Sequence, residues 1–290
     1  MIKKVAYTVL GLVVISVVGA VGYRGYIGIV AGNGEISREV QADRSFAVSD
    51  ESSGRPGIIQ YGVTSGDGGD SVARFLILER IFGRENMVEG TTRQIDGSFL
   101  INYLDASVRV GEFEINVRDI RTRSLDVDIE EQGWTDGERD VVIRGRILES
   151  GRDEYEFTTF EPASVSGVPE SFEVGDTLQM VVTGDLTIRG ATSRVSFDME
   201  LSLDSAERIS GFASTTVRWA DFGITVPYVG GGSDVDAVAD SVELQLEFTA
   251  EEEGRLGVTE LERISRRGSR HGVSGWSPGE LSRVYHPAWL

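Results

Sequence analysis

The chain has 290 residues, enough for one large or two small domains with a sizeable buried core. The formal net charge is −19. Residues 1–57 carry a net charge of +1 and residues 251–290 a net charge of 0, so residues 58–250 carry a net charge of −20. A segment this acidic repels phosphate backbones, which disfavours a nucleic-acid-binding function. Cysteine is absent, which excludes disulfides, thiolate catalysis and cysteine-based zinc sites.

An apolar run opens the chain. Residues 5–23 carry no charge, and this length is about that needed to span a bilayer core. Lys3 and Lys4 precede the run and only Arg24 follows it, so the positive-inside rule places the N-terminus in the cytoplasm. A cleaved signal peptide is the alternative. Its apolar core is usually about 7–15 residues long and is followed by an A-x-A-like cleavage site, and this sequence has no clear site of that kind. We therefore predict a single-pass anchor in the cell membrane, with the rest of the chain extracytoplasmic, either periplasmic or extracellular.

Four segments follow from the composition along the chain. The membrane anchor takes residues 1–31, and the polar residues 32–57 lack apolar periodicity, which predicts a flexible linker. Residues 58–250 hold nearly all of the alternating pattern typical of strands. Residues 251–290 begin with a helix-like stretch and continue as a mixture of Gly, Ser and Arg, which predicts a disordered tail.

The strands of the middle segment alternate strictly between apolar and polar residues. Val195, Phe197 and Met199 alternate with Ser196 and Asp198, and residues 112–118, 178–182 and 242–249 show the same pattern. Strands with one polar face suit an antiparallel sheet whose outer face is in water. The acidic side chains on the polar faces, Asp198, Glu200, Glu243 and Glu247 among them, are predicted to form a solvated outer surface.

One stretch has a helical period instead. In residues 137–148, "GERDVVIRGRIL", Val141 and Leu148 lie seven apart and Ile143 and Ile147 four apart. Several strands and one short helix, with every apolar face needing cover, predict a barrel or a sandwich. A barrel of about eight strands can enclose one small ligand.

Two motifs resemble those of a known family. "TGDLTIRGATSRVSF" at residues 183–197 resembles the strand–turn–strand hallmark of the YceI-like family, and "ASTTVRWADFGITVP" at residues 213–227 resembles its R-x-D-F-G segment. Further similar stretches are "VEGTTRQIDGSF", "YEFTTFEPASVSG" and "DSVELQLEF". The resemblance covers roughly residues 58–250. The sequence departs from the family in its acidic stretch before the helix, its membrane anchor and its C-terminal tail.

The resemblance implies an all-β, lipocalin-like antiparallel barrel of about eight strands with one short helix, preceded here by the transmembrane helix. It also implies a long apolar tunnel that holds a polyisoprenoid or similar long-chain lipid. No cofactor and no metal are expected, and the partners are this lipid and the membrane. If the inner faces line a tunnel, its predicted lipid-binding wall consists of Phe75, Ile77, Phe99, Ile101, Phe113, Ile115, Val182, Phe197, Met199 and Leu244.

The alternation alone leaves a second interpretation open, because any sheet protein needs a buried core. In that interpretation the barrel is filled by its own side chains and serves as an envelope interaction or adhesion module. An enzyme is not expected, since both histidines, His271 and His286, lie in the tail and no nucleophile or nucleotide-binding motif occurs.

Three residues of the two motifs have structural interpretations. Gly184 and Gly190 are predicted to form a bulge and a tight turn. Arg218 is predicted to pair with a carboxylate at a barrel end, although contact with a lipid headgroup is the alternative.

Overall fold

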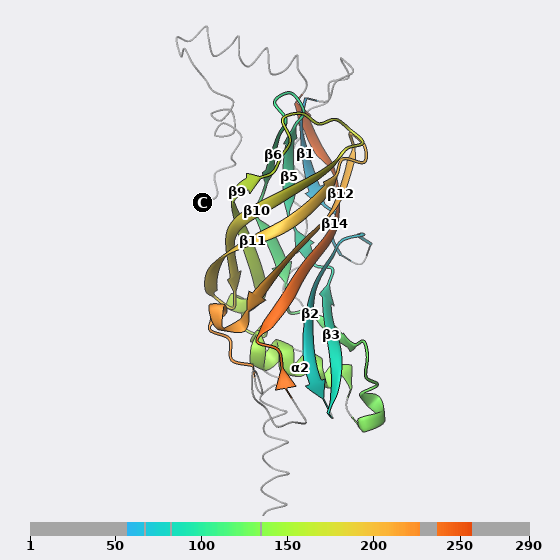
Figure 1. Ribbon diagram of the computed structural model, residues 1–290, viewed down its shortest axis with the longest axis vertical. Helices are drawn as coiled ribbons and strands as arrows, with labels where there is room; N and C mark the ends of the chain where they lie inside the picture. The colour runs from blue at the N-terminus through green and yellow to red at the C-terminus, as the bar shows by residue number, and fades with distance from the viewer. Residues whose placement is uncertain (1–56, 67, 82, 134, 227–236, 257–290) are drawn as a thin grey trace, which may run out of the picture.

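The computed structural model describes residues 57–66, 68–81, 83–133, 135–226 and 237–256, and its strands form one antiparallel sheet (Figure 1). The predicted anchor, most of the predicted linker and most of the predicted tail lie outside these residues. Within them, no helix has the length and apolar character needed to cross a membrane. The strands are β1 (Ile58–Val63), β2 (Val72–Ile81), β3 (Arg84–Thr92), β4 (Ile95–Asp96), β5 (Ser98–Asn102), β6 (Ser107–Val110), β7 (Phe113–Asn116), β8 (Arg121–Ser124), β9 (Phe157–Ser166), β10 (Thr177–Ile188), β11 (Ala191–Ser202), β12 (Arg208–Arg218), β13 (Ala237–Val238) and β14 (Ser241–Leu256).

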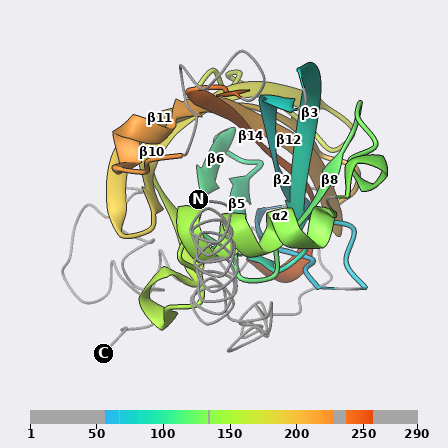
Figure 2. The ribbon, with the colours of Figure 1, turned by 90° about the horizontal axis from the view of Figure 1, so that it is seen from below.

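The sheet curls strongly. Its main order is β4-β7-β9-β10-β11-β12-β14-β1-β5-β6, while β2, β3, β8 and β13 branch from β14. The outermost strand at one end, β4, is separated from β5 near the other end by Gly97 alone. The chain therefore connects one end of the order directly to the strand next to the other end, and the strands wrap around a common interior (Figure 2).

This architecture confirms the predicted antiparallel all-β fold with one short helix, in the form of a half-barrel. The sheet has 14 strands where about eight were predicted. The difference arises because long stretches are divided: β3, β4 and β5 follow one another with only short interruptions, yet each pairs with a different neighbour. The last strand, β14, also runs to Leu256, past the predicted boundary at residue 250, because its end pairs with β1.

The hairpin of β10 and β11 contains the first family motif. Ile188 pairs with Ala191, which leaves Arg189 and Gly190 as a two-residue turn, with φ of 50° and 73°. Two positive φ angles are typical of a type I′ turn, which matches the twist of the flanking strands. At Gly184 the register of β10 against β9 shifts by a bulge. Both glycine predictions are confirmed.

The short helix α2 (Asp136–Val142) lies across one open end of the curled sheet (Figure 2). Thr135 and Glu138 form a capping box, which satisfies backbone N–H groups at its start. The helix continues as a π-helical turn, η3 (Ile143–Ile147), so the helical period predicted for residues 137–148 is confirmed in place. The described residues also include three short 3₁₀ turns: η2 (Glu130–Gln132), η4 (Asp153–Tyr155) and η5 (Trp219–Phe222).

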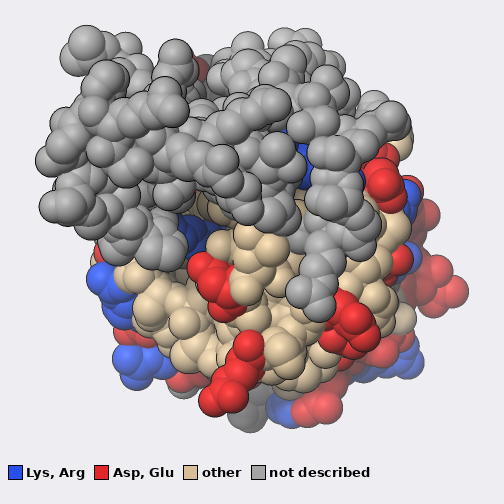
Figure 3. All heavy atoms as spheres, turned by 90° about the horizontal axis from the view of Figure 1, so that it is seen from above, with Lys and Arg blue, Asp and Glu red and all other residues tan. Residues whose placement is uncertain are grey.

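The interior differs between the two ends of the sheet. At the end opposite α2, Tyr61, Leu201 and Ile209 are fully buried in a packed core. The Tyr61 hydroxyl lies 3.1 Å from that of Tyr103 and donates to the carbonyl oxygen of Ala206, and burial raises the pKa of Tyr61. On the visible part of this end, acidic side chains lie around an uncharged centre, and basic side chains lie toward the rim (Figure 3). We call it the packed end, and the other the helix end.

Candidate functional site

An apolar cavity of about 610 Å³ occupies the helix end of the interior. Its size is within the range of about 300–1,000 Å³ that is typical of small-molecule sites. The inward-facing side chains of β2, β3 and β14 form one wall, and those of β9, β10 and β11 form the other. Residues 142, 143, 147 and 148 of the helical segment close the end with apolar side chains.

Most of the predicted wall residues meet in this cavity. Those that line it are Phe75, Ile77, Phe113, Ile115, Phe197, Met199 and Leu244. The other three, Phe99, Ile101 and Val182, are fully buried but lie outside the lining, so their placement in the tunnel wall is corrected. They pack the core beyond the cavity. The alternative of an interior filled by side chains therefore describes only the packed end.

Glycines on neighbouring strands make room for the aromatic side chains of the wall. Phe75 of β2 is paired with Gly90 of β3, and a Cβ atom at Gly90 would lie 2.1 Å from the Phe75 ring. The Phe160 ring lies over Gly184 in the same way, with a separation of 2.7 Å from a Cβ built there. These rings can lie against the sheet because no side chain lifts them off it, which leaves the centre of the cavity open.

The charged residues of the lining are unevenly placed. Apart from Arg74, they are Glu79 and Arg80 at the end of β2 and Arg139 and Arg146 on the helical segment, all at the helix end. Deeper in the cavity the polar residues are threonines, Gln245 and its β2 partner Arg74, whose guanidinium forms ion pairs with Glu89 and Glu247. The cavity is therefore apolar along its length and polar at one end, which suits an amphiphile with its polar group near the helix.

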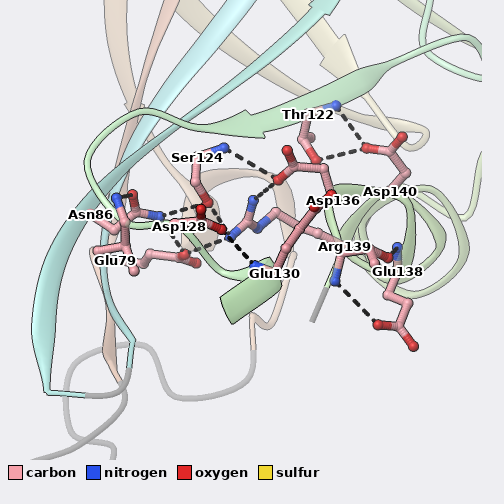
Figure 4. Close-up of polar contacts among 12 residues, drawn as sticks. Glu79, Asn86, Thr122, Ser124, Asp128, Glu130, Asp136, Glu138, Arg139 and Asp140 are labelled. Atoms are coloured by element: carbon pink, nitrogen blue, oxygen red, sulfur yellow. Dashed lines mark hydrogen bonds and ion pairs between the residues drawn. The ribbon is translucent and has the colours of Figure 1, made fainter. Parts of the chain in front are cut away.

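A buried polar network attaches the helix to the sheet (Figure 4). The Arg139 guanidinium donates to Glu79 of β2 at 3.0 Å, to Ser124 of β8 at 2.9 Å and to Asp136 at 2.7 Å. Asn86 of β3 donates to the same Glu79 oxygen at 2.9 Å. We call Glu79, Asn86, Ser124 and Arg139 the helix-anchoring network. It fixes the helix over the end of the cavity.

A second buried contact holds the next turn of the helix. The Asp140 carboxylate accepts hydrogen bonds from the backbone N–H and the hydroxyl of Thr122, both at 2.7 Å. One turn later, Arg144 donates to the backbone carbonyl oxygens of Asp140 and Arg118. Burial lowers the pKa of Arg144, and the charge of Arg121 acts in the same direction. These groups support the helix from outside the cavity.

The helical segment contributes several wall residues that the sequence did not predict. One face of this segment, with residues spaced three or four apart, lines the cavity with Arg139, Val142, Ile143, Arg146 and Ile147. The spacing of Ile143 and Ile147 was a usable signal, but nothing in it indicated which sheet opening the helix would cover. Ala213 and Trp219 also line the cavity, and the sequence gives no sign of it.

The R-x-D-F-G-like motif around Arg218 has a structural explanation. The Arg218 guanidinium donates to Asp221 at 2.8 Å across the start of η5. The prediction that Arg218 pairs with a carboxylate is confirmed, and Arg218 does not line the cavity.

Comparison with known proteins gives one family and several similar folds. The family model described as a YceI-like domain matches residues 68–250. No curated protein matches the chain. Among solved structures, BcnA of Burkholderia cenocepacia is 14% identical, with coverage of 62% of this chain and 95% of that one and a TM-score of 0.43. A domain of Saccharophagus degradans described as polyisoprenoid-binding and implicated in plant cell wall breakdown is 13% identical, with coverage of 67% and 99% and a TM-score of 0.42. A YceI protein of Campylobacter jejuni is 16% identical, with coverage of 56% and 84% and a TM-score of 0.39.

Proposed function

The chain belongs to the YceI-like family, and we propose that its cavity binds a polyisoprenoid or similar long apolar amphiphile. The observation that carries this proposal is the distribution of polarity in the lining: apolar along the walls, with Glu79, Arg80, Arg139 and Arg146 at one end. An apolar chain would extend toward the packed end, and its polar group would lie beside the helix.

The energetics suit binding without catalysis. Burying an apolar chain contributes about 0.8 kcal/mol per CH₂, so a few isoprene units offset the entropy lost on ordering the ligand. This interaction needs no cofactor and no charged group deep in the cavity. The curled sheet, in which the end strand β4 is the chain neighbour of β5 near the opposite end, would act as a lipocalin-like barrel around the ligand.

The binding proposal is tested by extracting the purified protein with organic solvent and identifying the extract by mass spectrometry. We expect a long-chain isoprenoid or related lipid in amounts comparable with the protein. Val88→Phe should reduce the amount, because Val88 lines the cavity. Val181→Phe is the matched control, since Val181 faces outward from β10. Absence of lipid from the wild-type extract, together with no uptake of added polyprenol, would contradict the proposal.

We propose further that the binding domain is held outside the cytoplasm by an N-terminal membrane anchor. The uncharged run of residues 5–23, with Lys3 and Lys4 before it, supports this location. The full-length protein should stay in the membrane fraction through carbonate and salt washes. A soluble exported form whose N-terminus begins near residues 20–34 would contradict it.

A further inference from the structure

Two stacked phenylalanine rings lie immediately beyond the inner limit of the cavity. Phe248 is the next inward-facing residue of β14 after Leu246, which lines the cavity, and Phe248 itself does not. Phe99 of β5 stacks on Phe248 with ring centroids 4.8 Å apart and an interplanar angle of 19°. Phe113, which does line the cavity, meets the Phe99 ring edge-on at 5.7 Å.

These rings have little freedom to move. Phe99 is fully buried and Phe248 is 2% exposed. The Phe248 ring lies over Gly211 of β12, where a Cβ atom would be 2.5 Å away, and the Phe113 ring lies over Gly97, where a Cβ atom would be 2.4 Å away. A continuous row of ring contacts therefore leads from β12 to the turn between β4 and β5.

The lining ends at the same level on β12, the strand next to β14, and on β11 beside it. Met199 of β11 lines the cavity, but Leu201, the next inward-facing residue, is fully buried outside the lining. On β12, Ala213 lines the cavity, whereas Gly211, which pairs with both Leu201 and Phe248, does not. The same boundary thus recurs on three strands, and the stacked pair is its largest element.

We propose that Phe99 and Phe248 form a stop that sets the longest apolar chain the cavity accepts. This inference rests on the proposed function and deepens it, because it assigns chain-length selectivity to named residues. A chain shorter than the cavity leaves apolar wall uncovered, whereas a longer one must leave carbons in water at the helix end.

The selectivity has a characteristic profile. Affinity rises with each isoprene unit that still fits, by about tenfold or more, because about two additional buried methylene groups suffice for a tenfold gain. Beyond the stop the added unit is not buried, so affinity levels off or falls.

The test measures binding of delipidated protein to the prenyl alcohols geraniol, farnesol, geranylgeraniol and longer polyprenols by calorimetry or native mass spectrometry. Phe248→Ala should shift the limiting length to a longer alcohol by at least one isoprene unit. Phe212→Ala is the matched control, because Phe212 is exposed on β12 and should leave the limit unchanged.

A second variant should shorten the longest alcohol that the cavity accepts. It keeps the proposal testable if Phe248→Ala does not fold. Ala213 lines the cavity and pairs with Met199 and Leu246, both at its inner boundary. Ala213→Leu should shift the limit to a shorter alcohol.

The outcomes separate the two proposals. A wild-type length profile that neither variant shifts, with both variants folded, would overturn the stop while leaving the binding function intact. No binding of any prenyl alcohol by the wild type would overturn the binding function, and the stop with it.

Discussion

Phe75 and Gly90 face each other across β2 and β3, and the ring of the first occupies the space that a side chain of the second would need. Phe248 and Gly211 have the same relationship across β14 and β12. The surroundings differ: the Phe75 ring faces the cavity, whereas the Phe248 ring is held in the packed core by Phe99.

This difference predicts different effects on stability for the same Gly→Ala substitution at the two positions. In Gly90→Ala the atoms nearest to the new methyl group all belong to the Phe75 ring, which can turn into the cavity, so we expect a stability change within about 1 kcal/mol and weaker ligand binding. In Gly211→Ala the methyl group would meet the Phe248 ring and the Glu200 carbonyl oxygen, each at 2.5 Å, and we expect a loss of about 1–3 kcal/mol. Urea denaturation measures both, and equal losses would argue against the open cavity beside Phe75.

Val88 and Val182 allow a second matched comparison. Both are fully buried, but only Val88 lines the cavity. Val182→Phe should overpack the core and destabilise the protein by about 1–3 kcal/mol. Val88→Phe has free volume available, so it should retain near-normal stability and lose bound lipid. A large stability loss in Val88→Phe would show that the cavity cannot accept the ring.

The helix-anchoring network should be sensitive to removal of either charge. Arg139→Gln leaves the partly buried Glu79 without its ion-pair partner, and we expect a loss of about 3 kcal/mol in the free energy of unfolding, the lower end for a buried pair. Combining Glu79→Leu with Arg139→Met should recover much of this loss, because neither charge then needs a partner. A double-mutant cycle measures the coupling, and additive losses would contradict it.

The outer surface beside β7 carries a pH-dependent repulsion. Burial raises the pKa of Glu112, and the neighbouring Glu161, Glu114 and Asp96 act in the same direction. The folded state therefore binds this proton more tightly than the unfolded state, so the group favours folding as pH falls from neutrality toward its ordinary value of 4.5.

Glu112→Gln should consequently stabilise the protein at neutral pH and lose that advantage on acidification. Denaturation at a series of pH values tests it, with Glu243→Gln on the outer face of β14 as the control. A constant difference between Glu112→Gln and the wild type across the series would exclude this explanation.

The sequence predicts well which side chains of each strand face the interior. It predicts poorly whether an inward-facing side chain lines the cavity or lies in the packed core. The alternation of Phe197 and Met199 with polar residues identifies the side that is buried. It does not distinguish Met199, which lines the cavity, from Val182, which lies in packed core, because depth depends on strand register and on the tilt of the sheet. Phe99 and Ile101 were misplaced for the same reason.

The cavity itself could be expected only from the family resemblance. Its width depends on pairs such as Phe75 and Gly90, which lie 15 positions apart and meet only through the β2–β3 register. Arg139 is a charged residue on an apolar helix face, and its burial depends on Glu79 from a distant strand. No local pattern in one sequence encodes such contacts.

The register of β1 against β14 has a practical consequence for engineering. Ile58 and Leu256, the first and last residues of the sheet, are direct partners at the packed end. Antiparallel partners have Cα atoms about 4.5–5.5 Å apart, so the domain begins and ends at almost one point. Such a domain can be inserted into a surface loop of a host protein without separating the two sides of that loop. The helix end of the cavity would then project away from the host.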